Sequence, residues 1–254
     1  MLLRRVIEHV KAQNWTAVAL DFVIVVVGVF IGIQMANWNE ARAEKKLATA
    51  LASQLLADLK QDRVLAQLVL DYFSAVSDAA HVTIDQLDDP DTDPEAFAVN
   101  AYNATEFMIT PQHRSTYDEL LATGSLGLVG DANFRNLLVL YYRQDSMQTL
   151  GQYVRDSAYR ETLRRTMPHS VQEAVRSACG DIYGDSGYII GLKVDCELGM
   201  PEDDLRAAVE AIRTRPSMAE DLRFYLSTLD AHIDGVSGMK HRLDVLIETG
   251  EALH

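Results

Sequence analysis

The chain of 254 residues contains little proline, glycine or cysteine, with 6 Pro, 14 Gly and 2 Cys, and only 7% of its residues are aromatic. Scarce proline and glycine argue against a sandwich of many short strands joined by tight turns. Basic residues are also in the minority, at 23 against 37 acidic ones. A hydrophobic fraction of 48% is nevertheless enough to build a core, which excludes intrinsic disorder. We therefore expect an all-α protein with one sizeable domain or two small ones.

The acidic charge is concentrated in one part of the chain. Residues 1–38 carry three basic and two acidic side chains, a net charge of +1, so the total of −14 leaves −15 for residues 39–254. A domain with that charge repels phosphate backbones. The composition thus predicts no nucleic-acid partner.

A long apolar run lies near the N-terminus. Residues 22–33, FVIVVVGVFIGI, are all apolar or glycine, and Trp15 and Trp38 bracket them. A helix over these 24 residues spans ~35 Å, enough for a hydrocarbon core of ~30 Å, with both tryptophans at the interfaces. We predict a transmembrane helix over 15–38, preceded by a short cytoplasmic amphipathic segment, 1–14.

Two other interpretations of this run are a buried soluble helix and a cleaved signal peptide. A buried soluble helix is disfavoured by twelve unbroken β-branched, aromatic or glycine residues. A cleaved signal peptide is suggested by Ala41-Arg42-Ala43, but that site lies too far beyond Ile33. We therefore expect an uncleaved, single-pass anchor in the lipid bilayer.

One face of this helix carries unusual residues. Gly28 and Gly32 form a GxxxG pair, which lets a second helix approach closely. Asp21 falls on the same face, with Val25 and Met35, in 4-3-4-3 spacing. We predict that Asp21, Gly28 and Gly32 form a helix contact surface, which favours a homo-oligomer. The alternatives are a chance GxxxG match and an Asp21 that sits near the headgroups.

The two cysteines bear on the compartment. Cys179 and Cys196 are the only ones in the chain, and both lie in the large domain. An even pair in a cysteine-poor sequence suits a disulfide in an oxidising periplasm, whereas two unrelated buried thiols are the alternative. Basic residues on the two sides of the span are nearly balanced and settle little. We predict a bacterial inner-membrane protein whose large domain is periplasmic.

The N-terminal 45 residues carry a resemblance. The stretch LRRVIEHVKAQNWTAVALDFVIVVVGVFIGIQMANWNEAR resembles the N-terminus of an uncharacterised family of bacterial inner-membrane proteins known as a domain of unknown function. The similarity is strongest at LDF, VVVGVFIGIQ and NWNE. A looser similarity appears at Tyr117, Leu120, Gly124, Leu126 and Tyr141-Tyr142. The resemblance implies a topology and no activity.

The soluble part, residues 39–254, reads as helical. Apolar residues at three-to-four spacing and the lack of proline and glycine predict a stalk helix over 39–88. Central helices over 94–179 and C-terminal helices over 201–254 follow. The last helix has an almost heptad seam that should pack on the stalk in an antiparallel bundle. Residues 180–200 are rich in glycine and β-forming residues and predict a loop or hairpin.

Local signals mark where these helices begin. Asp93 before Pro94, and Asp131, are predicted N-caps. Capping-box spacing occurs in three further places: Thr116 with Glu119, Ser170 with Glu173 and Ser217 with Glu220.

Four motifs partly resemble known catalytic or ligand-binding sites. Gly184-Asp185-Ser186-Gly187 matches a short signature of serine proteases without its usual continuation. Asp89, Asp91 and Asp93 imitate half of a calcium loop, but the required glycine is Pro94. The run from Gly124 to Gly130 lacks the Lys-Ser/Thr of a phosphate loop. His113, in PQHRSTYDE, lies in a polar segment for which a surface turn is the simpler reading.

No catalytic, cofactor-binding or metal-binding residue is predicted from these motifs. The leading hypothesis is a non-enzymatic membrane-anchored scaffold or accessory subunit that self-associates. The alternative is a periplasmic sensor signalling through a membrane-protein partner, and a hydrolase is third.

Overall fold

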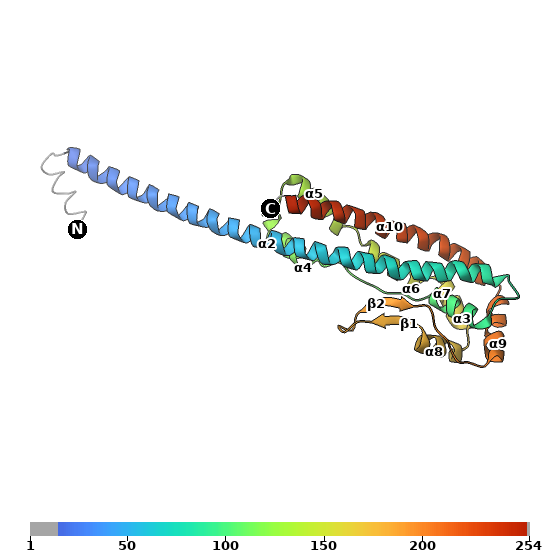
Figure 1. Cartoon of the computed structure of the whole chain (residues 1–254). Coiled ribbons are helices and arrows are strands. Elements are labelled where there is room, and N and C mark those ends of the chain that lie inside the picture. The colour runs from blue at the N-terminus through green and yellow to red at the C-terminus, as the bar shows by residue number, and fades with distance from the viewer. Residues whose placement is uncertain (1–14, 253–254) are drawn as a thin grey trace.

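The computed structural model describes residues 15–252, so the predicted segment 1–14 lies outside the described residues. One helix, α2 (Trp15–Leu87), runs through 73 residues without a break. Its first part projects from the domain and its second part forms one side of it (Figure 1). The predicted transmembrane helix and the predicted stalk are therefore a single element.

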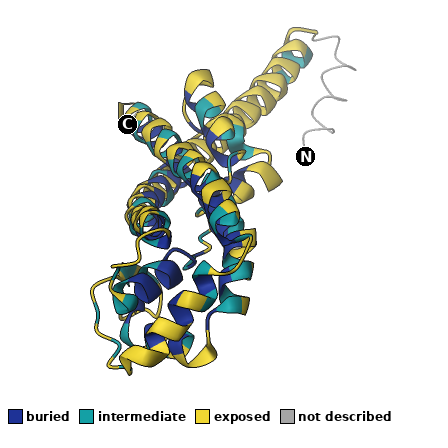
Figure 2. Cartoon of the chain, turned by 90° about the vertical axis from the view of Figure 1, so that its right-hand side faces the viewer, coloured by how far each residue is buried: buried dark blue, intermediate teal, exposed yellow. Residues whose placement is uncertain are grey.

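Packing onto α2 begins at Leu51, the first buried residue of the helix. Before that point almost every position is exposed, as the yellow helix that leaves the domain in Figure 2 shows. Leu47, part of the apolar pattern along the stalk, is 50% exposed. The bare part of α2 thus extends about twelve residues beyond the predicted span.

Most of the remaining chain is helical, and the fold is all-α, as predicted. The other helices of the domain are α3 (Pro94–Asn103), α4 (Ser115–Ala122), η1 (Ser125–Leu128), α5 (Ala132–Tyr142), α6 (Ser146–Arg155), α7 (Ala158–Thr166), α8 (His169–Ala178), α9 (Glu202–Arg213) and α10 (Met218–Ala252).

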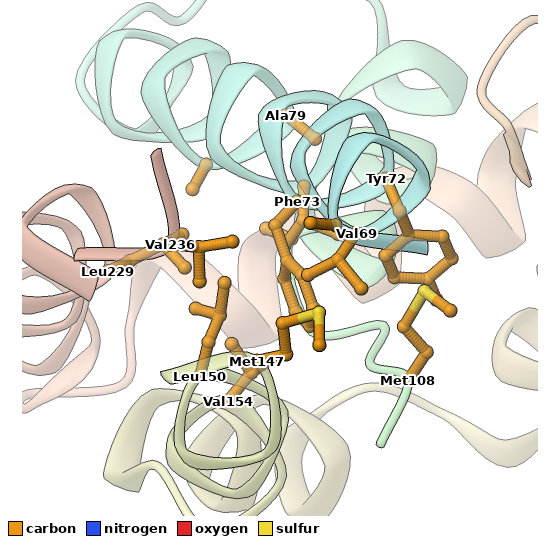
Figure 3. Packing of buried hydrophobic residues seen from close by; sticks show 14 of the residues in the cluster. Val69, Tyr72, Phe73, Ala79, Met108, Met147, Leu150, Val154, Leu229 and Val236 are labelled. Carbon is orange, nitrogen blue, oxygen red and sulfur yellow. The ribbon is translucent and has the colours of Figure 1, made fainter. Parts of the chain in front are cut away.

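The predicted pairing of the last helix with the stalk is confirmed. Helix α10 runs back along α2 and ends beside the place where α2 leaves the domain (Figure 1). Phe73 and Val69 of α2 meet Leu229 and Val236 of α10, and α6 closes the third side with Met147, Leu150 and Val154 (Figure 3). These side chains are 0–1% exposed, so the core lies among three helices.

Strands β1 (Gly180–Tyr183) and β2 (Ile189–Lys193) form an antiparallel hairpin within the segment predicted as a loop or hairpin. Its turn holds Gly187, whose φ of 77° lies in the left-handed region. The hairpin lies beside α2 and α8 (Figure 1).

Two of the predicted helix starts are confirmed. Asp93, which directly precedes Pro94, accepts a hydrogen bond from the Ala96 amide, and Asp131 accepts one from the Phe134 amide. Two capping boxes are wrong: Thr116 and Ser170 each lie one residue inside a helix, since α4 begins at Ser115 and α8 at His169. Helix α10 begins directly after Ser217, as predicted.

Candidate functional site

The contact face predicted in the membrane helix is open. Gly28 and Gly32 lie on a regular helix, and a Cβ atom added at either would meet nothing within 4 Å. Asp21, 20° from Gly28 around an ideal helix, is partly buried. The segment has a mean hydropathy of 2.6 over its most apolar window, none of which is buried. It is the candidate membrane span among residues 15–252.

The two cysteines are joined at the base of the hairpin. Cys179 caps the end of α8 and pairs with Cys196 beyond β2, with 5.7 Å between the α-carbons. Two hydrogen bonds fix the same region. Tyr72 of α2 donates from its hydroxyl to Asp181 at 2.7 Å, and the Leu198 amide donates to Glu95 at 2.7 Å. The hairpin is therefore held by a covalent bond and by a contact to α2.

A polar cluster is built around a fully buried carboxylate, Asp62 of α2, which is 0% exposed. One carboxylate oxygen accepts from the His113 backbone amide at 2.8 Å and lies 2.7 Å from the Nδ1 of the same residue. The other accepts from the Tyr141 hydroxyl at 2.7 Å. Three donors thus compensate the cost of burying the charge. His113, for which a surface turn was the simpler prediction, is half-exposed but hydrogen-bonded to α2.

A second layer holds His113 in place. The Tyr142 hydroxyl donates to the His113 carbonyl at 3.0 Å, and Arg114 donates to the Tyr142 carbonyl at 2.9 Å. Arg114 also pairs with Asp118 at 3.1 Å. Tyr117 stacks on Tyr142, with ring centroids 4.2 Å apart. We call this set the Asp62 cluster: Asp62, His113, Arg114, Tyr117, Asp118, Tyr141 and Tyr142. Three tyrosines of the looser sequence similarity belong to it.

The two tyrosine hydroxyls of the cluster, those of Tyr141 and Tyr142, stay protonated at ordinary pH. Burial, and then the Asp62 charge, raise the pKa of Tyr141 far above its usual range. Burial and the charges of Asp62 and Asp58 do the same to the pKa of Tyr142. Both hydroxyls therefore stay protonated and remain donors.

The chemical capacity of the cluster is limited. His113 lines an open hollow of about 390 Å³ whose other lining residues are Lys60, Gln61, Val64, Leu65 and Leu68. An Asp–His pair can activate a hydroxyl or thiol nucleophile, but this lining offers neither. The arrangement is that of a clamp, which ties α2 to the α3–α4 connection and to α5.

The other motifs lie apart from one another. Ser186 is exposed in the hairpin turn, and no hydrogen bond found among residues 15–252 joins it to a histidine. Asp89 accepts from Asp91 and Thr92 within its own turn. Gly124 and Gly130 adopt positive φ at interhelical turns. Within the described part of the chain, no three His, Cys, Asp or Glu side chains gather to hold a metal ion.

No protein-family model, curated protein or solved structure matches this chain. The resemblance of the N-terminal 45 residues to an uncharacterised inner-membrane family therefore stays a prediction.

Proposed function

We propose that the protein is a scaffold or accessory subunit anchored by a single helix in the bacterial inner membrane, with its helical domain in the periplasm. The observation that carries this proposal is the continuity of α2. The helix that is apolar enough to cross a bilayer over residues 15–38 also supplies the core residues Leu55, Phe73 and Val76. The domain is thus fixed to the anchor rigidly, with no linker between them.

Self-association is the second part of the proposal. Two copies inserted in the same membrane with the same topology present the same helix face to each other, in parallel. The face with Gly28 and Gly32 has no side chain at two successive turns, so backbones can approach closely there. Nothing in residues 15–252 covers that face. Asp21 lies on the same side, so the two copies would bring their Asp21 carboxyl groups together. The two groups can share a hydrogen bond when one of them is protonated, whereas a lone carboxylate in a bilayer is costly.

Cross-linking in native membranes tests the interface. Gly28→Ile with Gly32→Ile should abolish the oligomer seen with the unchanged chain. The matched control is Val23→Ile with Val26→Ile, which adds two isoleucines on the opposite side of the helix. An oligomer that survives the glycine substitutions shows that this face is not the interface.

Thiol labelling tests the side of the membrane. In cells with a permeable outer membrane, an impermeant thiol reagent should label the protein only after reduction of the Cys179–Cys196 disulfide. Labelling that requires disruption of the inner membrane places the domain in the cytoplasm and rejects the periplasmic assignment.

A sensor is the second candidate function, and the Asp62 cluster favours it. His113 and Arg114 are each 40–50% exposed. His113 hydrogen-bonds the buried Asp62 on the helix that continues into the predicted span, whereas Arg114 bonds to Asp118 and to the Tyr142 carbonyl. A ligand that displaced His113 would therefore act directly on α2. Cross-linking followed by mass spectrometry separates a sensor from a homo-oligomeric scaffold, because a sensor requires a signalling partner in the membrane and a homo-oligomeric scaffold does not.

A further inference from the structure

An open hollow of about 400 Å³ lies where α6, the α6–α7 turn and α10 meet, in the half of the domain farther from the predicted span. Five of its eleven lining residues carry aromatic rings: Tyr153, Tyr159, Phe224, Tyr225 and His232. We propose that this aromatic hollow binds a small organic cation, a quaternary or protonated amine. The proposal does not depend on self-association.

The rings form a continuous wall. Tyr225 stacks on Tyr153 with centroids 5.8 Å apart, and Tyr159 lies 5.3 Å from Tyr225. The His232 ring lies 4.9 Å from the Tyr153 ring and is tilted against it by 41°. Such faces carry the negative part of the ring quadrupole, which attracts a cation within about 6 Å. Phe224, beside them on α10, is 69% exposed, which is unusual for a large apolar ring.

Tyr159 and Tyr225 are 0% and 1% exposed and form the back of the wall. The accessible ring surface belongs to Phe224 and to the half-buried Tyr153 and His232. The Tyr153 hydroxyl donates to the Tyr225 carbonyl at 3.2 Å, which fixes the ring of Tyr153 against α10. Burial raises the pKa of Tyr153 and that of Tyr225, so both phenols stay neutral. These two phenol rings therefore carry no charge at physiological pH.

One carboxylate at the hollow has no basic partner. Asp221 accepts from the Thr162 hydroxyl at 2.8 Å, and none of the ion pairs found within residues 15–252 includes it. The other lining carboxylate, Asp156, is already paired with Arg155 at 2.7 Å. The hollow thus holds one unneutralised negative charge beside aromatic faces.

This combination selects the class of ligand. A metal ion needs several oxygen ligands, and one unpaired carboxylate does not supply them. An anion would be repelled by Asp221 and by the domain charge of −15. A neutral apolar ligand would gain no electrostatic attraction from Asp221. An ammonium group with methyl or methylene substituents matches both the ring faces and the carboxylate.

Calorimetric titration of the full chain in detergent tests the site, with choline as the cation and 3,3-dimethylbutan-1-ol as its neutral isostere. Choline should bind at least about tenfold more tightly than the isostere, because only the cation gains from the rings and Asp221. Asp221→Asn should weaken choline binding about tenfold while keeping an acceptor for Thr162. Phe224→Ala should weaken it about threefold to tenfold.

The control is Tyr188→Ala, which removes a ring that is 77% exposed on the hairpin, away from the hollow. It should leave choline binding unchanged. Equal affinity for choline and its isostere, no effect of Asp221→Asn, or no heat of binding with choline would each overturn the proposal. Phe224 is exposed and Asp221→Asn preserves shape, so both variants should fold, as far-UV circular dichroism would verify.

Discussion

Asp62 and His113 are joined twice, through the ring Nδ1 at 2.7 Å and through the backbone amide at 2.8 Å, although 51 residues separate them in sequence. The double contact fixes both the side chain and the backbone of an irregular segment to one point of α2. Because that point is fully buried, its hydrogen bonds are exchanged with water only when the cluster opens.

Asp62→Asn should lower the free energy of unfolding by about 2 kcal/mol, because an amide offers one acceptor oxygen to three donors and adds donors of its own. Asp71→Asn is the matched control on the exposed side of the same helix and should change stability by less than about 0.5 kcal/mol. Denaturant unfolding of the full chain in detergent measures both. Equal effects of the two substitutions would contradict the role given to Asp62.

Replacing both Cys179 and Cys196 by serine should cost about 3 kcal/mol, since their separation of 17 residues closes a loop in the unfolded chain. Hydrogen exchange should quicken in residues 180–193, while amides in the core turns of α2 keep their relative protection. Unchanged exchange in the hairpin after reduction would show that Tyr72 and Glu95 alone hold it.

Two glycines in helices predict opposite results. A Cβ at Gly151 of α6 would overlap the Met108 carbonyl oxygen, so Gly151→Ala should destabilise the protein by about 3 kcal/mol or more. A Cβ at Gly235 of α10 meets nothing within 4 Å, so Gly235→Ala should stabilise it by about 0.5–1 kcal/mol. Thermal unfolding compares the two. Stabilisation by Gly151→Ala would show that helix propensity, and not close packing, governs Gly151, and destabilisation by Gly235→Ala would contradict the prediction for Gly235.

Stability should fall as pH rises above about 10, the ordinary pKa of tyrosine. Burial and the Asp62 charge raise the pKa of Tyr141 in the folded protein, so only the unfolded chain releases that proton just above pH 10. Each such tyrosine contributes a slope of about 1.4 kcal/mol per pH unit. Tyr141→Phe should flatten the slope between pH 10 and 11 by about that amount. Tyr188→Phe, at an exposed site, should leave the slope as it is.

Helical periodicity was sufficient to predict α2, its pairing with α10 and the class of the fold. A periodic pattern shows which face of a helix is buried, and it can be recognised from the spacing of apolar residues along the chain alone. Asp93 and Asp131 were predictable for the same reason, because an N-cap is satisfied within three residues. Thr116 and Ser170 failed because spacing does not show where a helix starts. Thr116 is fully buried, and Pro168 sets the start of α8.

The Asp62 cluster was not predicted, although one signal was present. The buried seam of α2 is Leu55, Leu59, Asp62, Ala66, Val69, Phe73, Val76 and Ala80, in which the aspartate occupies a core position. An acid at such a position indicates a buried polar contact, but its partners come from a distant, irregular segment. The aromatic hollow was not predicted for a similar reason, because its rings come from three different helices and form no regular spacing in the sequence.

Because α2 is one continuous helix, the number of residues between the candidate span and the domain sets the rotation of the domain about the helix axis. Each residue between the candidate span and the domain turns the helix by about 100°, so inserting one residue after Ala43 would rotate the domain by more than a quarter turn about the helix axis. Seven inserted residues would restore the azimuth to within about 20° and raise the domain by about 10 Å. From residue 38 to residue 87 the rod is about 75 Å long, and a tilt of about 10° in the bilayer displaces its far end by about 13 Å. Small reorientations of the anchor are thus magnified, not absorbed, before they reach the distal helices.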